Sequence, residues 1–267
     1  MRFLEGAATS RASREVIVAW MAIAMMSSDG AVLARDAGDP IRLAWTEGDV
    51  AGMTSILSAD GNQEIGFVEY HQTRHGDVLD TVRIAHFADG SSDEDEAVAR
   101  IDGTLEALRG RSIIRDVHGT PIVDVSIDVA GGHIAGFSQA GNAKTTYDLH
   151  EALPQATYWG PLIFIVLKNF NENATDGRLV FHTIAPTPRP RSLDMELVRE
   201  GSASVQRPGG RLQVSRFVLR PTINWLIDPI IQRIAPQAEF FVDAGSPPAL
   251  ARFEGPRDYS GKEIVLE

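Results

Sequence analysis

The sequence contains no cysteine among its 267 residues. Disulfide bonds, thiolate catalysis, zinc–thiolate sites and lipid attachment through cysteine are therefore excluded. A chain without thiols suits an oxidising compartment, where an unpaired thiol is a liability. Hydrophobic residues make up 43% of the chain, which is enough to bury a sizeable core without covalent cross-links.

Positive charge is also scarce. Lys and Arg number 25 against 36 Asp and Glu, so the formal net charge is −11. Basic residues cluster at only one place, where Arg189 and Arg191 stand among prolines. Because phosphate binding depends on clustered Lys and Arg, we expect neither nucleic acid nor an anionic bilayer surface as a partner.

Residues 1–34 have the order of a secretory signal peptide. A basic segment with Arg2, Arg11 and Arg14 precedes the apolar run 16–26, and the small-residue segment 27–34 ends at Ala34. We therefore predict cleavage after Ala34 and a single β-rich domain over residues 35–267. The other interpretation of the segment is an uncleaved anchor or an N-terminal core helix. No later stretch approaches the roughly 18 continuous apolar residues of a membrane helix, so we expect no stable membrane span after processing.

Strands dominate the remaining pattern. In residues 122–129 the aliphatic side chains alternate strictly with Asp124, Ser126 and Asp128, which predicts a strand with one buried face. Segments 64–73 and 78–87 flank a polar turn containing Gly76 and predict a β-hairpin. Further strands are expected at 133–137, 179–184, 193–198, 212–219, 239–242, 250–254 and 263–266. Strands and helices do not alternate, so a parallel α/β sheet is not expected.

Three short helices are predicted. One spans 92–110, with apolar residues at helical spacing, Ser92 as its N-cap, carboxylates in its first turn and Gly110 as its stop. A second spans 158–170 and is apolar on nearly every side, so it should be buried all round. A third spans 228–236, starting with Asp228 and Pro229.

The segment Gly136-Phe-Ser138-Gln-Ala140 nearly matches the Gly-x-Ser-x-Gly nucleophile elbow, with Ala140 in place of the second glycine. Its partners on paper are Asp148, Asp176 and His182. The simpler interpretation is a β-turn between two strands, because residues 141–146 are poor helix formers. A serine hydrolase using Ser138 is therefore an alternative function, and the simpler interpretation is favoured.

Other motifs are weaker. His71 and His75 have the spacing of a metal-binding pair on a helix, but the segment is predicted to be a hairpin. Residues 89–96 resemble a calcium loop yet lack its glycine and its final glutamate. Asn173 begins an Asn-Ala-Thr glycosylation pattern. No Gly-Lys-Ser/Thr phosphate loop or Gly-x-Gly-x-x-Gly motif is present. We expect no metal and no cofactor.

Two parts of the C-terminal half carry a resemblance. They are Gly-Pro-Leu-Ile-Phe-Ile-Val-Leu-Lys-Asn (160–169) leading to Pro-Thr-Pro-Arg-Pro-Arg (186–191), and Phe-Phe-Val-Asp (240–243), Pro-Ala-Leu-Ala-Arg (248–252) and Glu-Gly-Pro (254–256) before a final strand. In these the chain resembles a broad group of uncharacterised exported bacterial β proteins and is similar to periplasmic lipoprotein-carrier-like folds. The resemblance implies a curled antiparallel sheet or incomplete β-barrel, with two or three short helices on its concave side.

The same resemblance implies an apolar interior that binds an acyl chain or other lipid. Apolar residues in excess of what a simple sandwich needs are the candidate lining: Trp159, Leu162, Phe164, Trp225, Leu226 and Ile230. These residues either line a ligand site or simply fill the core. The sequence thus favours a periplasmic or secreted binding protein over an enzyme. A non-enzymatic envelope-assembly protein that binds partners through its sheet edges is a further alternative.

Overall fold

The computed structural model describes residues 40–185, 190–207, 209–222, 237–257 and 263–267. The predicted helix 228–236 and the signal segment 1–34 lie outside these residues. Within them the chain is mostly antiparallel β-structure, as predicted. The strands are β1 (Ile41–Arg42), β2 (Val50–Ser58), β3 (Glu64–His75), β4 (Val78–Phe87), β5 (Ser92–Arg100), β6 (Thr104–Arg115), β7 (Pro121–Asp128), β8 (His133–Ala140), β9 (Ala143–His150), β10 (Arg178–Ala185), β11 (Arg191–Arg207), β12 (Gly210–Pro221), β13 (Ala238–Asp243), β14 (Leu250–Pro256) and β15 (Glu263–Leu266).

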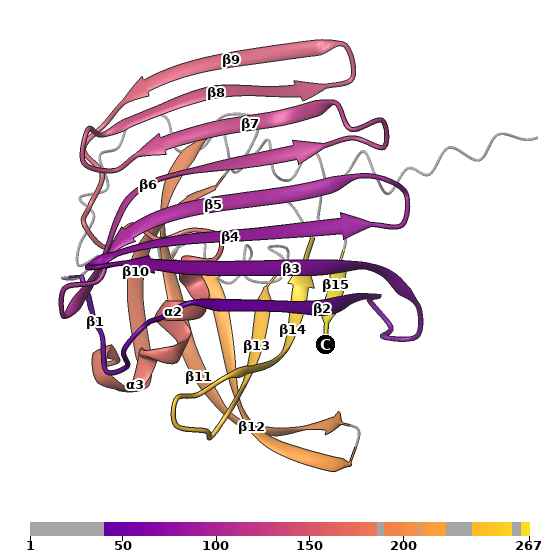
Figure 1. Ribbon diagram of the computed structural model, residues 1–267, viewed down its shortest axis with the longest axis vertical. Helices are drawn as coiled ribbons and strands as arrows, with labels where there is room; N and C mark the ends of the chain where they lie inside the picture. Colours follow the sequence, from indigo (N-terminus) through magenta and orange to yellow (C-terminus); the bar gives the residue numbers. More distant parts are fainter. Residues whose placement is uncertain (1–39, 186–189, 208, 223–236, 258–262) are drawn as a thin grey trace, which may run out of the picture.

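These strands belong to one open sheet in the order β10-β11-β12-β13-β14-β15-β2-β3-β4-β5-β6-β7-β8-β9, with β1 paired to β6 beside this path. Nearly every strand pairs with its neighbour in the chain. Among the described strands, the β1–β6 pair and the joint between β15 and β2, where Val265 lies opposite Leu57, connect strands that are distant in the chain. Figure 1 shows the result: β2–β9 form one layer and β10–β14 run behind it in a different direction.

Two short helices, α2 (Leu162–Lys168) and α3 (Phe170–Asn173), follow β9; in Figure 1 α2 is drawn near the left ends of β2 and β3, and α3 lies below them. The predicted helix over 158–170 is confirmed for 162–168, whereas residues 158–161 precede it without helical structure. As predicted, its apolar residues Leu162, Ile163, Ile165, Val166 and Leu167 are all buried. Their side chains join those of β4–β8 and β10–β13 in one cluster, which we call the main core. Neither helix, nor any other in the described ranges, has the length and apolarity required to cross a bilayer.

The local patterns explain the confirmed strands. Val123, Val125 and Ile127 of β7 are buried, and the residues between them remain wetter. The predicted hairpin is β3–β4, in which His75 pairs with Val78 across a two-residue turn. Gly76 has φ +67 in that turn, a conformation that glycine adopts without strain.

The prediction of a helix over 92–110 is wrong. Residues 92–100 and 104–115 are the neighbouring strands β5 and β6, joined at Gly103, which has φ +68. The apolar residues that matched a helical face lie on two strands or in the turn between them. The carboxylates expected to favour a helix N-terminus instead pair across the sheet: Asp95 binds Arg83 at 2.5 Å and Glu94 lies 3.5 Å from Arg115.

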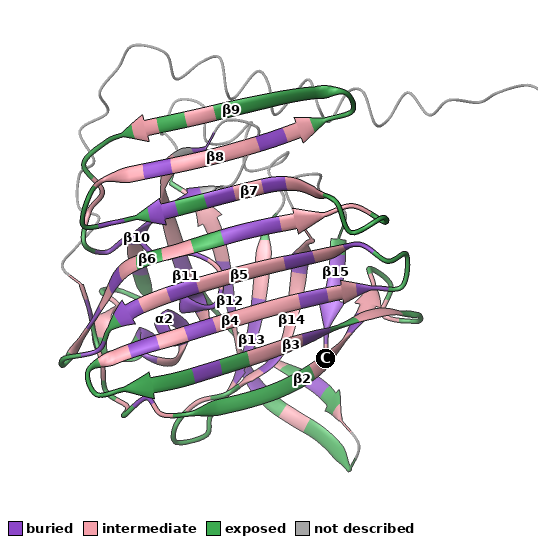
Figure 2. Ribbon diagram, turned by 45° about the horizontal axis from the view of Figure 1, so that its top comes forward, coloured by how far each residue is buried: buried purple, intermediate pink, exposed green. Residues whose placement is uncertain are grey.

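Burial differs sharply along the sheet. Figure 2 shows β4–β7 with alternating buried and wetter positions, whereas β9 and the first half of β2 are largely exposed. At the other end of the path, β10 is partly covered by the segment that follows β9. There Tyr158 N donates to His182 O at 2.7 Å and His182 N donates to Ala156 O at 2.8 Å.

Candidate functional site

The interior around α2 holds three of the predicted ligand-lining residues, and they differ in exposure. Trp159 is 3% exposed and Leu162 is fully buried, so both contribute to the packing of the main core. The indole of Trp159 lies against β6 at Gly110, where an added Cβ would stand 2.4 Å from its Cζ2 atom and 2.3 Å from Glu96 O. Its Nε1 donates to Glu96 O at 3.4 Å.

Phe164 is the exception on α2. Its side chain is only half-buried, at the margin of the main core. Its ring stands edge-on to the ring of Tyr70 on β3, with the centroids 6.1 Å apart. The other three predicted lining residues, Trp225, Leu226 and Ile230, lie outside the described residues.

A buried polar network adjoins this aromatic pair. Glu47, whose side chain is 3% exposed, lies 2.9 Å from Nζ of Lys168 at the end of α2. Gln72 Nε2 donates to Glu47 Oε2 at 3.3 Å and to Gly48 O at 2.7 Å, and Tyr70 Oη donates to Gln72 Oε1 at 2.7 Å. Burial, with the charge of Glu47 adding to it, raises the pKa of Tyr70. The phenol therefore stays neutral and acts as a hydrogen-bond donor.

The nucleophile elbow is not formed at Ser138. Strand β8 runs straight through this residue, which pairs with Val123 on one side and Thr145 on the other. The chain turns only at Gly141–Asn142 and continues as β9, so neither the predicted turn at the serine nor a following helix is present. The proposed partners are elsewhere as well: Asp148 binds His133, and His182 pairs with Asp194.

The weaker motifs also have structural explanations. His71 and His75 stand four residues apart on β3, so their Cα atoms are roughly 13 Å apart, and each has its own carboxylate neighbour. Asp89 accepts hydrogen bonds from the backbone and hydroxyl of Ser91 within the β4–β5 turn, and residues 92–96 continue as strand β5 rather than as a calcium-binding loop.

Asn173, the glycosylation candidate, is used internally. Its Oδ1 accepts from Arg42 N at 2.7 Å, and its Nδ2 donates to Arg42 O at 2.9 Å and to Asn169 O at 2.8 Å. The amide thereby connects α3 to β1, because it binds both the backbone N–H and the carbonyl of Arg42. A glycan on Nδ2 would disrupt these hydrogen bonds.

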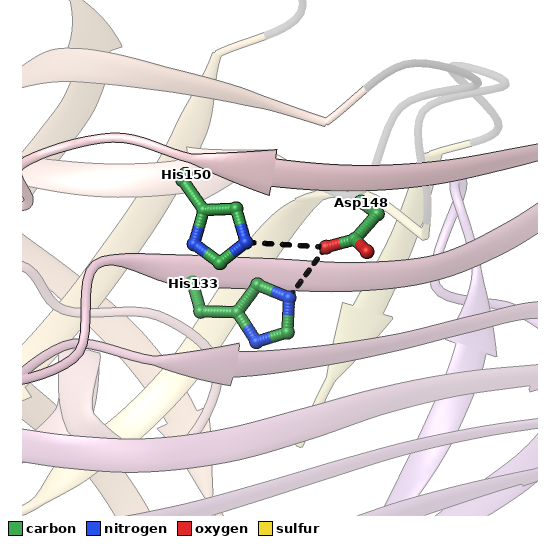
Figure 3. A group of neighbouring side chains, drawn as sticks. All are labelled: His133, Asp148 and His150. Carbon is green, nitrogen blue, oxygen red and sulfur yellow. Dashed lines mark hydrogen bonds and ion pairs between the residues drawn. The ribbon is translucent and has the colours of Figure 1, made fainter.

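A cluster that the sequence analysis missed lies on the β8–β9 hairpin. His133 Nε2 is 2.6 Å from Asp148 Oδ1, and His150 Nε2 is 3.7 Å from the same oxygen (Figure 3). The two imidazoles are stacked, with centroids 4.5 Å apart and an interplanar angle of 9°. One ligand atom from each residue lies within 4.8 Å of the others, so the three residues are candidates for binding one metal ion.

The sequence feature that could have predicted this cluster is the hairpin turn. A two-residue turn at Gly141–Asn142 sets His133 directly opposite His150, and Asp148 is the next residue on the same face of β9. Once the segment is treated as a hairpin rather than an elbow, the three residues are placed together by counting from the turn.

Comparison with known proteins assigns this chain to no family. No family model and no curated protein matches the sequence. One solved structure, titled a β-barrel-like protein of domain of unknown function DUF1849 from Brucella abortus, is similar over 85% of this chain and 95% of its own. The identity is 10% and the TM-score 0.44.

Proposed function

We propose that this protein is exported and binds an apolar ligand, such as an acyl chain, on the concave side of its curled sheet beside α2. The observation that carries the proposal is the half-buried ring of Phe164 on a helix whose other hydrophobic side chains are buried. When an apolar ligand covers an aromatic ring that is partly exposed to solvent, the buried apolar area favours binding by about 25 cal/mol per Å².

The surroundings of Phe164 favour an amphiphilic ligand. The ring of Tyr70 offers a second aromatic surface, and Lys168, whose side chain is 21% exposed, places an ammonium group one helical turn away on α2. Sites for small molecules commonly combine an apolar lining with a few polar groups that fix orientation. We expect the chain of the ligand to lie against Phe164, and a carboxylate or phosphate head would share the Lys168 ammonium with Glu47.

Export is the second part of the proposal. It is supported by the order of basic, apolar and small residues in segment 1–34 and by the absence of cysteine. Mass spectrometry of the protein from its native host should find an N-terminus at Arg35. An intact Met1 would rule out cleavage.

The binding proposal is tested with a dansyl-labelled fatty acid and a pair of matched variants. Phe164→Ser should weaken binding by about tenfold, because it removes apolar contact worth about 1.4 kcal/mol. Phe67→Ser is the control, because Phe67 is an aromatic residue of β3 that is 37% exposed. Its neighbour Val68 is buried in a second core, so Phe67 points to the opposite, solvent-facing side of the sheet. We expect its affinity to equal that of the wild type.

Equal affinities for both variants, or no binding of the probe by the wild type, would contradict the proposed site. Lipid extraction of protein purified from its host gives an independent readout, since a bound acyl chain should co-purify. Labelling of Ser138 by a fluorophosphonate probe would instead support the hydrolase alternative.

A further inference from the structure

We propose that the β8–β9 hairpin carries a binding site for a divalent transition-metal ion, with His133, Asp148 and His150 as ligands. The chemistry of the donors points to Zn²⁺ and its neighbours rather than to Ca²⁺ or Mg²⁺. Imidazole nitrogens suit zinc, copper and nickel, whereas the hard cations take oxygen ligands.

The distances fit a tetrahedral ion after small side-chain rotations. Zn–N and Zn–O distances near 2.0–2.1 Å place neighbouring ligand atoms roughly 3.3 Å apart. The observed separations of 2.6 Å and 3.7 Å lie on either side of this value. The side chains of Asp148 and His150 are 73% and 74% exposed, so solvent, not packing, surrounds them and they are free to make the adjustment.

The backbone holds the ligands in place. His133 and His150 are directly paired residues of an antiparallel ladder, so their Cα positions are fixed by the hairpin. Tyr147 and Leu149 of β9 pack against the main core, which turns the alternate residues Asp148 and His150 toward the opposite face. Because the backbone is already ordered by this pairing, only the side-chain rotamers must be fixed when a metal binds.

Charge also favours the ion. One oxygen of the Asp148 carboxylate faces the Nε2 atoms of both stacked imidazoles (Figure 3). A dication bound by two neutral imidazoles and one carboxylate keeps one net positive charge, and the chain as a whole carries −11. Three protein ligands leave a fourth position for water or an external ligand, as in open zinc sites.

The test is a Zn²⁺ titration of the full chain without an affinity tag, in which binding is measured by calorimetry or by competition with a chromophoric chelator. The wild type should bind one Zn²⁺ at this site, and His150→Ala and Asp148→Asn should each weaken that binding by roughly tenfold or more. His71→Ala is the matched control, since His71 is also an exposed strand histidine beside a carboxylate. Its affinity should be unchanged.

A structural readout completes the experiment. Zn²⁺ should shift the imidazole NMR signals of His133 and His150 and leave those of His71 and His75 in place. Circular dichroism of His150→Ala checks that the sheet is retained, as expected for a side chain 74% exposed. No saturable binding by the wild type, or His150→Ala binding as tightly as the wild type, would overturn the proposal.

Discussion

Tyr158→Phe removes one oxygen atom from the centre of the main core. In the native chain this hydroxyl donates to Leu105 O at 2.6 Å and accepts from Ile41 N at 3.0 Å. It thereby joins the segment before α2 to both strands of the β1–β6 pair. All three residues are buried: Tyr158 and Leu105 are fully enclosed, and Ile41 is 2% exposed.

The expected loss follows from the two backbone groups left behind. The phenyl ring still fills the same volume, so no large cavity forms. The N–H of Ile41 and the carbonyl of Leu105 each lose a partner where water cannot replace it, at a cost of about 1–3 kcal/mol per group. We expect the free energy of unfolding to fall by about 2–6 kcal/mol, a large part of the 5–15 kcal/mol typical of a folded domain.

Urea unfolding followed by far-UV circular dichroism measures this change, with an unchanged m-value as the sign that the compactness of both states is retained. Tyr70→Phe is the comparison, because its half-buried hydroxyl loses one bond, to the side chain of Gln72. Its cost should be about 0.5–1.5 kcal/mol. If Tyr158→Phe destabilises no more than Tyr70→Phe, the two hydrogen bonds do not have the role assigned to them.

Three further predictions concern the same core. Gly110→Ala should destabilise the fold by about 1–3 kcal/mol because the backbone oxygen and indole ring facing it leave no room for a Cβ, whereas Gly52→Ala, with nothing within 4 Å, should change the urea midpoint little. Lys168→Met should lower the free energy of unfolding in urea by about 3–5 kcal/mol, because it leaves the buried carboxylate of Glu47 without its cation. The double variant Lys168→Met/Glu47→Leu should regain most of this lost stability. Burial raises the pKa of Tyr158, so its contribution to stability is complete below the unfolded value near 10 and falls at higher pH; the fall should be shallower in Tyr158→Phe.

The sequence predicted elements whose pattern reflects one buried face. β7 was recognised because its aliphatic residues alternate with polar ones, and the β3–β4 hairpin because a glycine turn separates two β-prone runs. The apolar segment 158–170 was recognised as a buried helix because its hydrophobic residues have no polar face. These signals are local, so they survive without knowledge of the rest of the chain.

The prediction failed where distant residues decided the outcome. Residues 92–110 have apolar side chains at helical spacing, but β4 and β7 flank them and complete their hydrogen bonds as strands. The acidic run at 93–96 resembles the first turn of a helix. In the folded chain its carboxylates are instead paired with Arg83 and Arg115 of the neighbouring strands. Tertiary pairing here outweighs a weak local preference, as it commonly does.

The candidate sites divide in the same way. The sequence identified Trp159, Leu162 and Phe164 as a group, but only the packing shows that the first two are enclosed and the third is left half-exposed. The cluster of His133, Asp148 and His150 depends on the register of one hairpin, which a single local turn sets.

What the sequence by itself determined is the β-rich class, most of the strands and the buried helix, because side-chain periodicity records which face of each element avoids water. What only the tertiary structure decided is the path of the sheet, in which the last strand pairs with β2, and the side chains that meet across it. These depend on contacts between segments far apart in the chain, and no local pattern encodes which pairing has the lowest free energy.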